Sequence, residues 1–276
     1  MATSPAIARP RSVGSSACFF TRTRSLSRTR CPASRSHCGV PCPPTWPCFS
    51  PCWNSRRRPV RRFDLLVFDW DGTLMDSTGL IALCIRQAAR DLALPEPDDL
   101  AAKHVIGLGL HDATARLFPR CTEAARLEFA LRFRHHYVAR DHEAPLYKGV
   151  APMLAALSRD DRFMAIATGK PRAGLDRSLT HTGIKSYFDF TRCADEGFPK
   201  PHPDMLERLM DFCAVEKESV LMIGDSTHDL ELAQNAGVQA VAVSYGAHPV
   251  DQLAARAPLA IVNSVGELEQ WLITNA

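Results

Sequence analysis

The residues best suited to chemistry are polar side chains placed directly after short apolar runs. Asp69 and Asp71 follow the run at 65–68 and precede Gly72. Side chains two apart on an extended chain point to the same side, and two like charges so close need a cation or a shared proton. A hard divalent ion such as Mg²⁺ meets that need through oxygen ligands. This pair of carboxylates therefore indicates a Mg²⁺ site.

Three further groups come later in the chain. Thr168 and Gly169 end the next apolar run and offer a hydroxyl and an open backbone N–H. Lys200 lies between prolines that fix the chain ahead of a helix. Asp225 and Asp229 follow a third apolar run. Each group alone could be structural, as a helix cap, a solvated lysine or a turn. Their occurrence together, in this order, favours a catalytic site.

These groups need a scaffold that brings the ends of separate strands together. Short apolar runs typical of buried parallel strands alternate with helical stretches. Strands are expected at 65–68, 163–167, 219–223, 240–243 and 259–262, and helices near 151–159, 172–182, 203–213, 227–236 and 265–274. This alternation indicates βαβ units, so we predict an α/β fold with a doubly wound, Rossmann-like parallel sheet. Such sheets bind ligands at the carboxyl ends of their strands, where the polar groups lie.

Residues 79–146 interrupt the alternation of strands and helices. Helical periodicity covers 80–93, 109–118 and 122–141, with prolines at 95 and 97 and no convincing strand. We predict an all-helical cap at 79–146, inserted into a catalytic core made of residues 63–78 and 147–276. Four cap residues are candidates for substrate contact, although Gly-rich turns between helices are usually only turns. They are Lys103, His104, Gly107 and Gly109.

Residues 1–62 differ in composition from the rest of the chain. They contain twelve Arg, no Lys, no Asp or Glu, six of the ten Cys and nine of the 20 Pro. Such a segment cannot bury enough apolar surface to offset its ordering entropy, so we expect disorder. The remaining 21 Lys and Arg against 30 Asp and Glu give the other residues a net charge of −9. The overall charge of +3 therefore does not indicate nucleic-acid binding.

Two interpretations of residues 1–62 remain open. An Arg- and Ser-rich, acid-free composition is typical of an organellar transit peptide. We favour upstream sequence translated from a start assigned too early, because initiation at Val60 would reach the first strand within a few residues. The cysteines at 38, 42, 48 and 52 lack the Cys-x-x-Cys spacing of most zinc sites.

The cysteines after residue 62 are scattered singly, as in a reduced cytosolic protein. No run of 18 uncharged apolar residues is present, so a membrane-spanning helix is not expected. We therefore expect a cytoplasmic protein that associates with neither membrane nor nucleic acid.

With these motifs in this order, residues 63–276 resemble the haloacid dehalogenase-like (HAD) hydrolase superfamily. The four motifs are Asp69-Trp-Asp71-Gly-Thr-Leu-Met-Asp76-Ser77, Thr168-Gly169, Lys200-Pro-His-Pro and Gly-Asp225-Ser-Thr-His-Asp229. The helical insert is similar to that of the small-cap subclass, which includes phosphoglycolate phosphatase, pyrophosphatases and β-phosphoglucomutase.

The resemblance implies a role for each carboxylate. Asp69 is expected to attack phosphorus and form an aspartyl-phosphate. Asp71 is expected to protonate the departing alkoxide and then to activate the hydrolytic water. The Asp69 side chain, the Asp71 backbone carbonyl and Asp225 would hold Mg²⁺. Asp229 is a supporting residue that would orient Lys200 or a metal-bound water.

The resemblance also implies which groups bind the phosphoryl oxygens. Thr168 and the backbone N–H at Gly169 would bind these oxygens, and Lys200 would balance the charge of the nucleophile and the transferring group. Gly169 stands where many phosphoglycolate phosphatases carry Asn, which speaks against that particular substrate.

The acid at position 71 separates this chain from the dehalogenases and phosphonate-cleaving members of the superfamily, which lack one. The resemblance therefore implies a Mg²⁺-dependent phosphatase that acts on a small-molecule, phosphoglycolate-like phosphate monoester. The expected partner is a soluble phosphorylated metabolite. The alternatives are a phosphomutase of the β-phosphoglucomutase type, a pyrophosphatase and a non-catalytic phosphate-sensing module.

Overall fold

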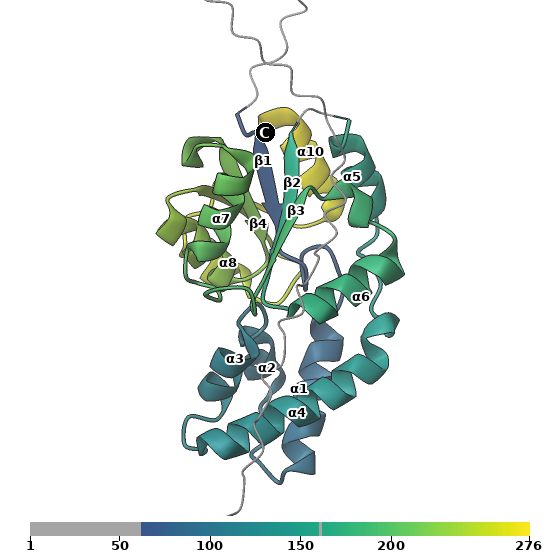
Figure 1. Cartoon of the computed structure of the whole chain (residues 1–276), viewed down its shortest axis with the longest axis vertical. Coiled ribbons are helices and arrows are strands. Elements are labelled where there is room, and N and C mark those ends of the chain that lie inside the picture. The colour runs from purple at the N-terminus through teal and green to yellow at the C-terminus, as the bar shows by residue number, and fades with distance from the viewer. Residues whose placement is uncertain (1–61, 160–161) are drawn as a thin grey trace, which may run out of the picture. The chain divides into compact units, whose positions relative to one another are not determined.

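The computed structural model of the 276-residue chain describes residues 62–159 and 162–276 (Figure 1). The interpretations of residues 1–61, including the cysteine spacing and the start at Val60, fall outside the described residues. No described helix is both long enough and apolar enough to cross a membrane.

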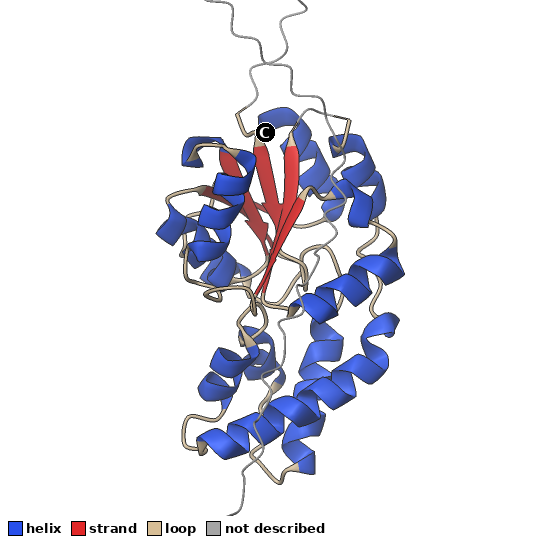
Figure 2. Cartoon of the chain, in the orientation of Figure 1, coloured by secondary structure: helices blue, strands red, loops and turns tan. Residues whose placement is uncertain are grey.

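One parallel sheet organises the described residues (Figure 2). Its strands are β1 (Leu65–Phe68), β2 (Phe163–Thr168), β3 (Phe190–Cys193), β4 (Val220–Gly224), β5 (Gln239–Val243) and β6 (Ala260–Val262). Their spatial order is β3-β2-β1-β4-β5-β6, and every neighbouring pair is parallel. This is the strand order of a doubly wound fold, so the predicted fold class is confirmed.

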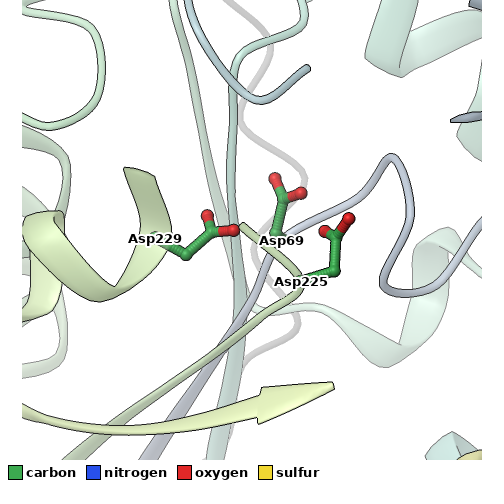
Figure 3. A group of neighbouring side chains, drawn as sticks. All are labelled: Asp69, Asp225 and Asp229. Carbon is green, nitrogen blue, oxygen red and sulfur yellow. The ribbon is translucent and has the colours of Figure 1, made fainter. Parts of the chain in front are cut away.

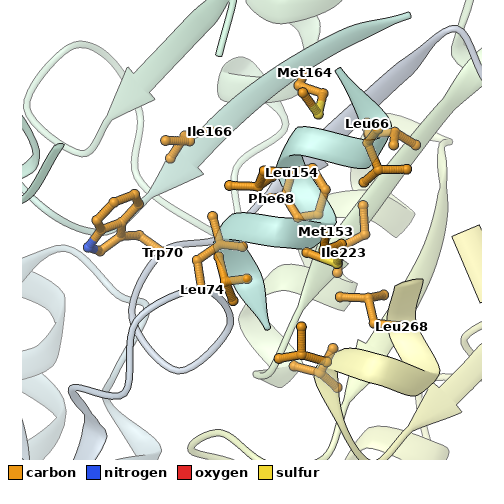
Figure 4. Close-up of a cluster of buried hydrophobic side chains, with 14 of the residues drawn as sticks. Leu66, Phe68, Trp70, Leu74, Met153, Leu154, Met164, Ile166, Ile223 and Leu268 are labelled. Carbon is orange, nitrogen blue, oxygen red and sulfur yellow. The ribbon is translucent and has the colours of Figure 1, made fainter. Parts of the chain in front are cut away.

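Alternate residues of each strand face opposite sides of the sheet, and helices cover both sides. On one side, Leu66, Phe68 and Ile166 pack with side chains of α5, α6 and α10 (Figure 4). On the other side, Leu65, Val67 and neighbouring strand residues pack with α7, α8 and α9. These helices are α5 (Val150–Leu157), α6 (Arg172–Thr182), α7 (Asp204–Cys213), α8 (Thr227–Ala236), α9 (Val250–Ala254) and α10 (Val265–Asn275).

Between β1 and α5 the chain is mostly helical and lies beyond the carboxyl ends of the strands (Figure 1). We call it the helical insert: α1 (Thr78–Asp91), α2 (Asp99–His104), α3 (Leu110–Leu117), α4 (Glu123–Arg140) and the short 3-10 helix η1 (Asp141–Glu143). Its own apolar cluster includes Ile81, Ile85, Val105, Phe129 and Tyr137. Two further 3-10 helices, η2 (Lys185–Tyr187) and η3 (Lys217–Ser219), lie in the sheet region.

Three elements have no counterpart in the sequence prediction. β3 pairs only with β2, and three of its four residues are half-buried, so it lacks the apolar run of a central strand. The run at 219–223 therefore belongs to the fourth strand of the chain and not to the third. The helices α2 and α9 have six and five residues, too few for a clear helical period.

Candidate active site

The acidic residues gather where the strand order of the sheet reverses. Asp69 follows β1 and Asp225 follows β4, and these two strands are neighbours at the sheet centre. Chain connections leave β1 and β4 in opposite directions, which opens a crevice at the carboxyl edge. Asp229 reaches the same place from the first turn of α8 (Figure 3). One carboxylate oxygen from each of Asp69, Asp225 and Asp229 lies within 4.8 Å of the other two, and all three residues are buried.

Lys200 connects two of these carboxylates. Its Nζ donates to Asp69 Oδ1 and to Asp229 Oδ1, each at 2.6 Å, and its side chain is fully buried. The other oxygen of Asp229 accepts from the Ser226 backbone N–H at 3.0 Å and from its hydroxyl at 2.7 Å. Asp229 is thereby fixed at the start of α8 and fixes Lys200 against Asp69. Burial opposes the charge on Lys200, but Asp229 and Asp69 outweigh it and raise the pKa of the lysine.

Asp225 is held by neutral donors. Its Oδ1 accepts from the Thr73 hydroxyl at 2.9 Å, and its Oδ2 accepts from the Ala247 backbone N–H at 2.6 Å. Gly72 adopts a positive φ of 91°, and a Cβ there would clash with the Asp225 carboxylate. The turn after β1 can therefore approach Asp225 only because position 72 is glycine.

The charges of this cluster favour a bound cation. The cluster contains three carboxylates and one ammonium group, which contacts Asp69 and Asp229, so a surplus of two negative charges is left when all groups are ionised. Burial raises the pKa of Asp69 to about 7, although Lys200 acts in the opposite direction. Burial, with Asp69 and Asp229 adding to it, also raises the pKa of Asp225 well above its ordinary value. Buried carboxylates that resist ionisation and present several oxygens suit a hard ion such as Mg²⁺.

Asp71 lies in a separate ion pair. Lys170 Nζ donates to both Asp71 oxygens, at 2.9 and 3.1 Å, and to the Tyr137 hydroxyl at 2.6 Å. The Ser77 hydroxyl donates to Asp71 Oδ1 at 2.7 Å. Burial opposes the charge on Lys170, but Asp71 and Tyr137 raise its pKa. Burial also raises the pKa of Tyr137 to about 12, so its hydroxyl stays protonated at neutral pH. Asp69 and Asp71 thus pair with different lysines, Lys200 and Lys170.

Thr168 and Gly169 end β2 beside these carboxylates. The Thr168 hydroxyl oxygen accepts from the Lys170 backbone N–H at 3.2 Å, which leaves its proton free to donate to a phosphoryl oxygen. A Cβ at Gly169 would lie 2.5 Å from the carbonyl oxygen of Gly107. Glycine at position 169 therefore permits the turn between α2 and α3 to approach the end of β2.

A cavity of about 640 Å³ lies between the sheet edge and the helical insert. From the sheet edge it is bordered by Asp69, Asp71, Thr168, Gly169 and Lys170. From the insert, apolar side chains predominate, among them Ile81, Ile85, Leu117, Phe129 and Phe133. A ligand in this cavity would therefore meet the carboxylates at one wall and an apolar surface at the other.

The structure brings the predicted site residues together in two groups. One group is the buried cluster of Asp69, Asp225, Asp229 and Lys200. Asp71 lies outside this cluster, borders the cavity and pairs with Lys170. The sequence analysis singled out Gly169 but not Lys170, and it missed the contacts of this lysine with Asp71 and Tyr137. The glycine before Lys170 drew attention to this segment, but no signal in the sequence pairs the lysine with Tyr137, 33 residues away.

The four cap candidates separate into two pairs. Gly107 and Gly109 border the cavity, whereas Lys103 forms an ion pair with Asp99 at 2.8 Å. The His104 ring stacks on His248, with centroids 4.6 Å apart. Burial and the neighbouring His228 and His104 rings lower the pKa of His248 to about 4. The His104 side chain therefore packs against the sheet region and does not border the cavity.

Comparison with known proteins agrees with this arrangement. Residues 66–243 match the family described as haloacid dehalogenase-like hydrolase. The chain is 36% identical over 210 residues to a probable phosphatase, IndB, of Dickeya dadantii, a match that spans 74% of this chain and 91% of that protein. It is 29% identical over 222 residues to a phosphoglycolate phosphatase of Vibrio vulnificus, across 77% of this chain and 97% of the relative.

Solved structures give the same result. A crystal structure of a predicted phosphoglycolate phosphatase from Haemophilus somnus superposes with a TM-score of 0.70 and 27% identity, covering 78% of this chain and all of that one. The chain described here belongs to the haloacid dehalogenase-like hydrolases, an enzyme family, as the resemblance of its motifs predicts.

Proposed function

We propose that this chain is a Mg²⁺-dependent phosphatase that hydrolyses a small-molecule phosphate monoester through an aspartyl-phosphate on Asp69. The observation that carries the proposal is the buried arrangement of Asp69, Lys200, Asp225 and Asp229 at the β1/β4 crevice. The relatives named as phosphatases support the same activity. Residues 63–78 and 147–276 would form the catalytic core, and residues 79–146 the cap.

Asp69 is placed to act as the nucleophile. It borders the cavity, and Lys200 contacts its Oδ1 only, which leaves Oδ2 available to attack phosphorus. Lys200 would also balance the charge on the transferring phosphoryl group. Thr168 and the backbone N–H of Gly169 would bind the phosphoryl oxygens from the end of β2.

Asp71 would serve as acid and base for the two half-reactions. It borders the same cavity as Asp69 and is oriented by Lys170 and Ser77. In the first half-reaction it would donate a proton to the leaving alkoxide, and in the second it would accept one from the attacking water. The two carboxylates thereby divide one displacement into two steps.

The Asp69 and Asp225 side chains and the Asp71 backbone carbonyl would hold Mg²⁺. The bound ion would neutralise the repulsion between a carboxylate nucleophile and a phosphate dianion. Asp229 has one oxygen on Lys200 and the other on Ser226, so it acts by orienting Lys200.

Phosphate release by the full chain tests this function. The substrate panel includes 2-phosphoglycolate, pyrophosphate, sugar phosphates and alkyl phosphates, each with Mg²⁺ and with EDTA, and Asp69→Asn is the control. The proposal expects inorganic phosphate from at least one monoester, only with Mg²⁺ and only from the unsubstituted chain. An isomerised sugar phosphate without free phosphate would instead identify a mutase, and an inactive chain that binds Mg²⁺ would identify a phosphate-sensing module.

A further inference from the structure

The cavity between the sheet edge and the helical insert is larger and less polar than a two-carbon acid requires. Its volume of about 640 Å³ lies within the roughly 300–1,000 Å³ range of pockets that hold drug-sized ligands. The apolar side chains come from three helices of the insert: Ile81 and Ile85 on α1, Leu117 on α3, and Phe129 and Phe133 on α4. Three separate helices thus present one continuous apolar wall to the catalytic carboxylates.

The basic groups at this cavity are already paired or exposed to solvent. Lys170 is held by Asp71 and Tyr137. Arg177 pairs with Asp141 at 2.9 Å, and His111 lies 3.4 Å from Asp112 and 3.3 Å from Glu123. Arg134 is exposed on α4. A carboxylate on the leaving group would therefore meet no buried cation on the apolar wall.

Acidic side chains at the cavity also disfavour an anionic leaving group. Asp112 and Asp195 border the cavity in addition to the two catalytic carboxylates. A carboxylate on the leaving group would lie near these acids, and it would lose water without gaining a buried cation that is not already paired. An apolar leaving group has neither penalty and gains from leaving water.

We infer that the cavity selects phosphate monoesters of apolar alcohols, with an alkyl or aromatic leaving group, over small anionic esters such as 2-phosphoglycolate. This inference rests on the proposed phosphatase function and specifies its substrate class. The phosphoryl group lies at Asp69 and Thr168, and the leaving group extends along the wall formed by Ile85, Leu117 and Phe133.

A homologous series of alkyl phosphates measures this selection directly. The full chain with Mg²⁺ is assayed on methyl, ethyl, butyl and hexyl phosphate, with 2-phosphoglycolate for comparison. Each methylene buried in the cavity is expected to raise kcat/KM about three- to fourfold, since binding of an apolar group lowers KM with little change in kcat. Over the five methylenes that separate hexyl from methyl phosphate, kcat/KM should therefore rise roughly 200- to 1,000-fold if each of them is buried, and hexyl phosphate should surpass 2-phosphoglycolate.

A matched pair of phenylalanine substitutions places the effect in the cavity. Phe133→Ala removes part of the apolar wall and is expected to lower the hexyl-to-methyl ratio of kcat/KM about tenfold. Phe212 is 56% exposed on α7, away from the residues that border the cavity. Phe212→Ala is therefore expected to leave that ratio unchanged.

The outcomes separate the inference from the proposed function. A rising series that depends on Phe133 supports both. Hydrolysis with no dependence on chain length, or with 2-phosphoglycolate as the best substrate, overturns the inference and keeps the phosphatase. Failure to release phosphate from every monoester, with the chain folded, contradicts the proposed function itself.

Discussion

The carboxyl edge of the sheet and the helical insert border the same cavity with opposite kinds of side chain. The sheet edge contributes buried charges, each fixed by a specific partner, such as Lys200 between Asp69 and Asp229. The insert contributes mostly apolar groups, and its buried polar contact with the sheet-edge ion pairs is the hydroxyl of Tyr137 on Lys170. Under the proposed function, the sheet edge would perform the reaction, whereas the insert would select the shape and polarity of the leaving group.

This difference has a physical reason. A buried ion pair tolerates no loss of a partner, because the remaining charge is then left without compensation. An apolar wall can be reshaped by volume-conserving substitutions at modest cost in stability. Substitutions at the sheet edge should therefore abolish chemistry or folding, and substitutions in the insert should change selectivity.

The largest effect is expected for Asp69→Asn. Loss of the nucleophile should lower kcat by more than about a thousandfold, because no other carboxylate at the cavity has a free oxygen beside Lys200. Lys200 keeps Asp229 as a partner, so the variant should stay folded. Steady-state kinetics with circular dichroism measures both properties. Residual activity above about 1% would mean that another group attacks phosphorus.

The two buried lysines should differ in their contribution to stability. Lys200→Met leaves three buried carboxylates without a cation and should lower the free energy of unfolding by about 3–5 kcal/mol. Lys170→Met leaves Asp71 with the Ser77 hydroxyl, so a loss of about 1–3 kcal/mol is expected. Urea denaturation of both variants in EDTA tests the order. Equal losses of unfolding free energy in the two variants would contradict the expectation that the acidic cluster depends on its lysine more than the single ion pair does.

Mg²⁺ should bind the sheet edge more tightly as the pH rises. The pKa of Asp69 in the folded, metal-free chain is about 7, against an ordinary value of 3.8. Between these values the folded state holds a proton that the unfolded state has lost, so stability without metal falls as the pH rises through this window. Because Mg²⁺ must displace that proton, and the pKa of Asp225 is raised as well, its affinity should rise with pH by about tenfold per pH unit for each proton displaced.

Calorimetric titration of Mg²⁺ at pH 5.5, 6.5 and 8 measures this dependence. Proton release is read by repeating the titration in buffers of different ionisation enthalpy. An affinity that stays constant from pH 5.5 to 8, with no proton released, would exclude Asp69 as a group that ionises on binding.

The smallest effect is expected for Tyr137→Phe. This change removes one hydrogen bond, worth about 0.5–1.5 kcal/mol, while Lys170 keeps both Asp71 oxygens as partners and the ring stays in place. Hydrogen exchange should become faster in α4 and stay unchanged in β1 and β4, because the contact joins the insert to the sheet edge. Faster exchange at the strands as well would show that the insert and the sheet edge do not open independently.

The sheet edge and the insert also differ in how much of each could be predicted from the sequence. Asp69, Thr168 and Asp225 could be found because each lies at the carboxyl end of a strand that is an apolar run, and parallel strand ends meet at one edge. The half-buried edge strand β3 gave no such run and was missed. In the insert, the helical periods were recognisable, but the short α2 was not.

The cavity itself could not be read from the sequence. Ile85 and Phe129 have the spacing of ordinary core residues, and only the packing of separate helices leaves space beside them. The pairing of Lys170 with Asp71 and Tyr137 likewise depends on three segments far apart in the chain. Local patterns thus predicted the residues that belong to short motifs, and tertiary packing decided the rest.

The identity of the nucleophile is tested most directly by trapping the covalent intermediate. Asp71→Asn, which lacks the base for the second step, is mixed with p-nitrophenyl phosphate and Mg²⁺, quenched in acid, and analysed by peptide mass spectrometry. The good leaving group needs no acid, so the first step should proceed and a phosphoryl group should accumulate on Asp69. A phosphoryl group on any other residue, or nitrophenol released with no protein adduct, would contradict the account.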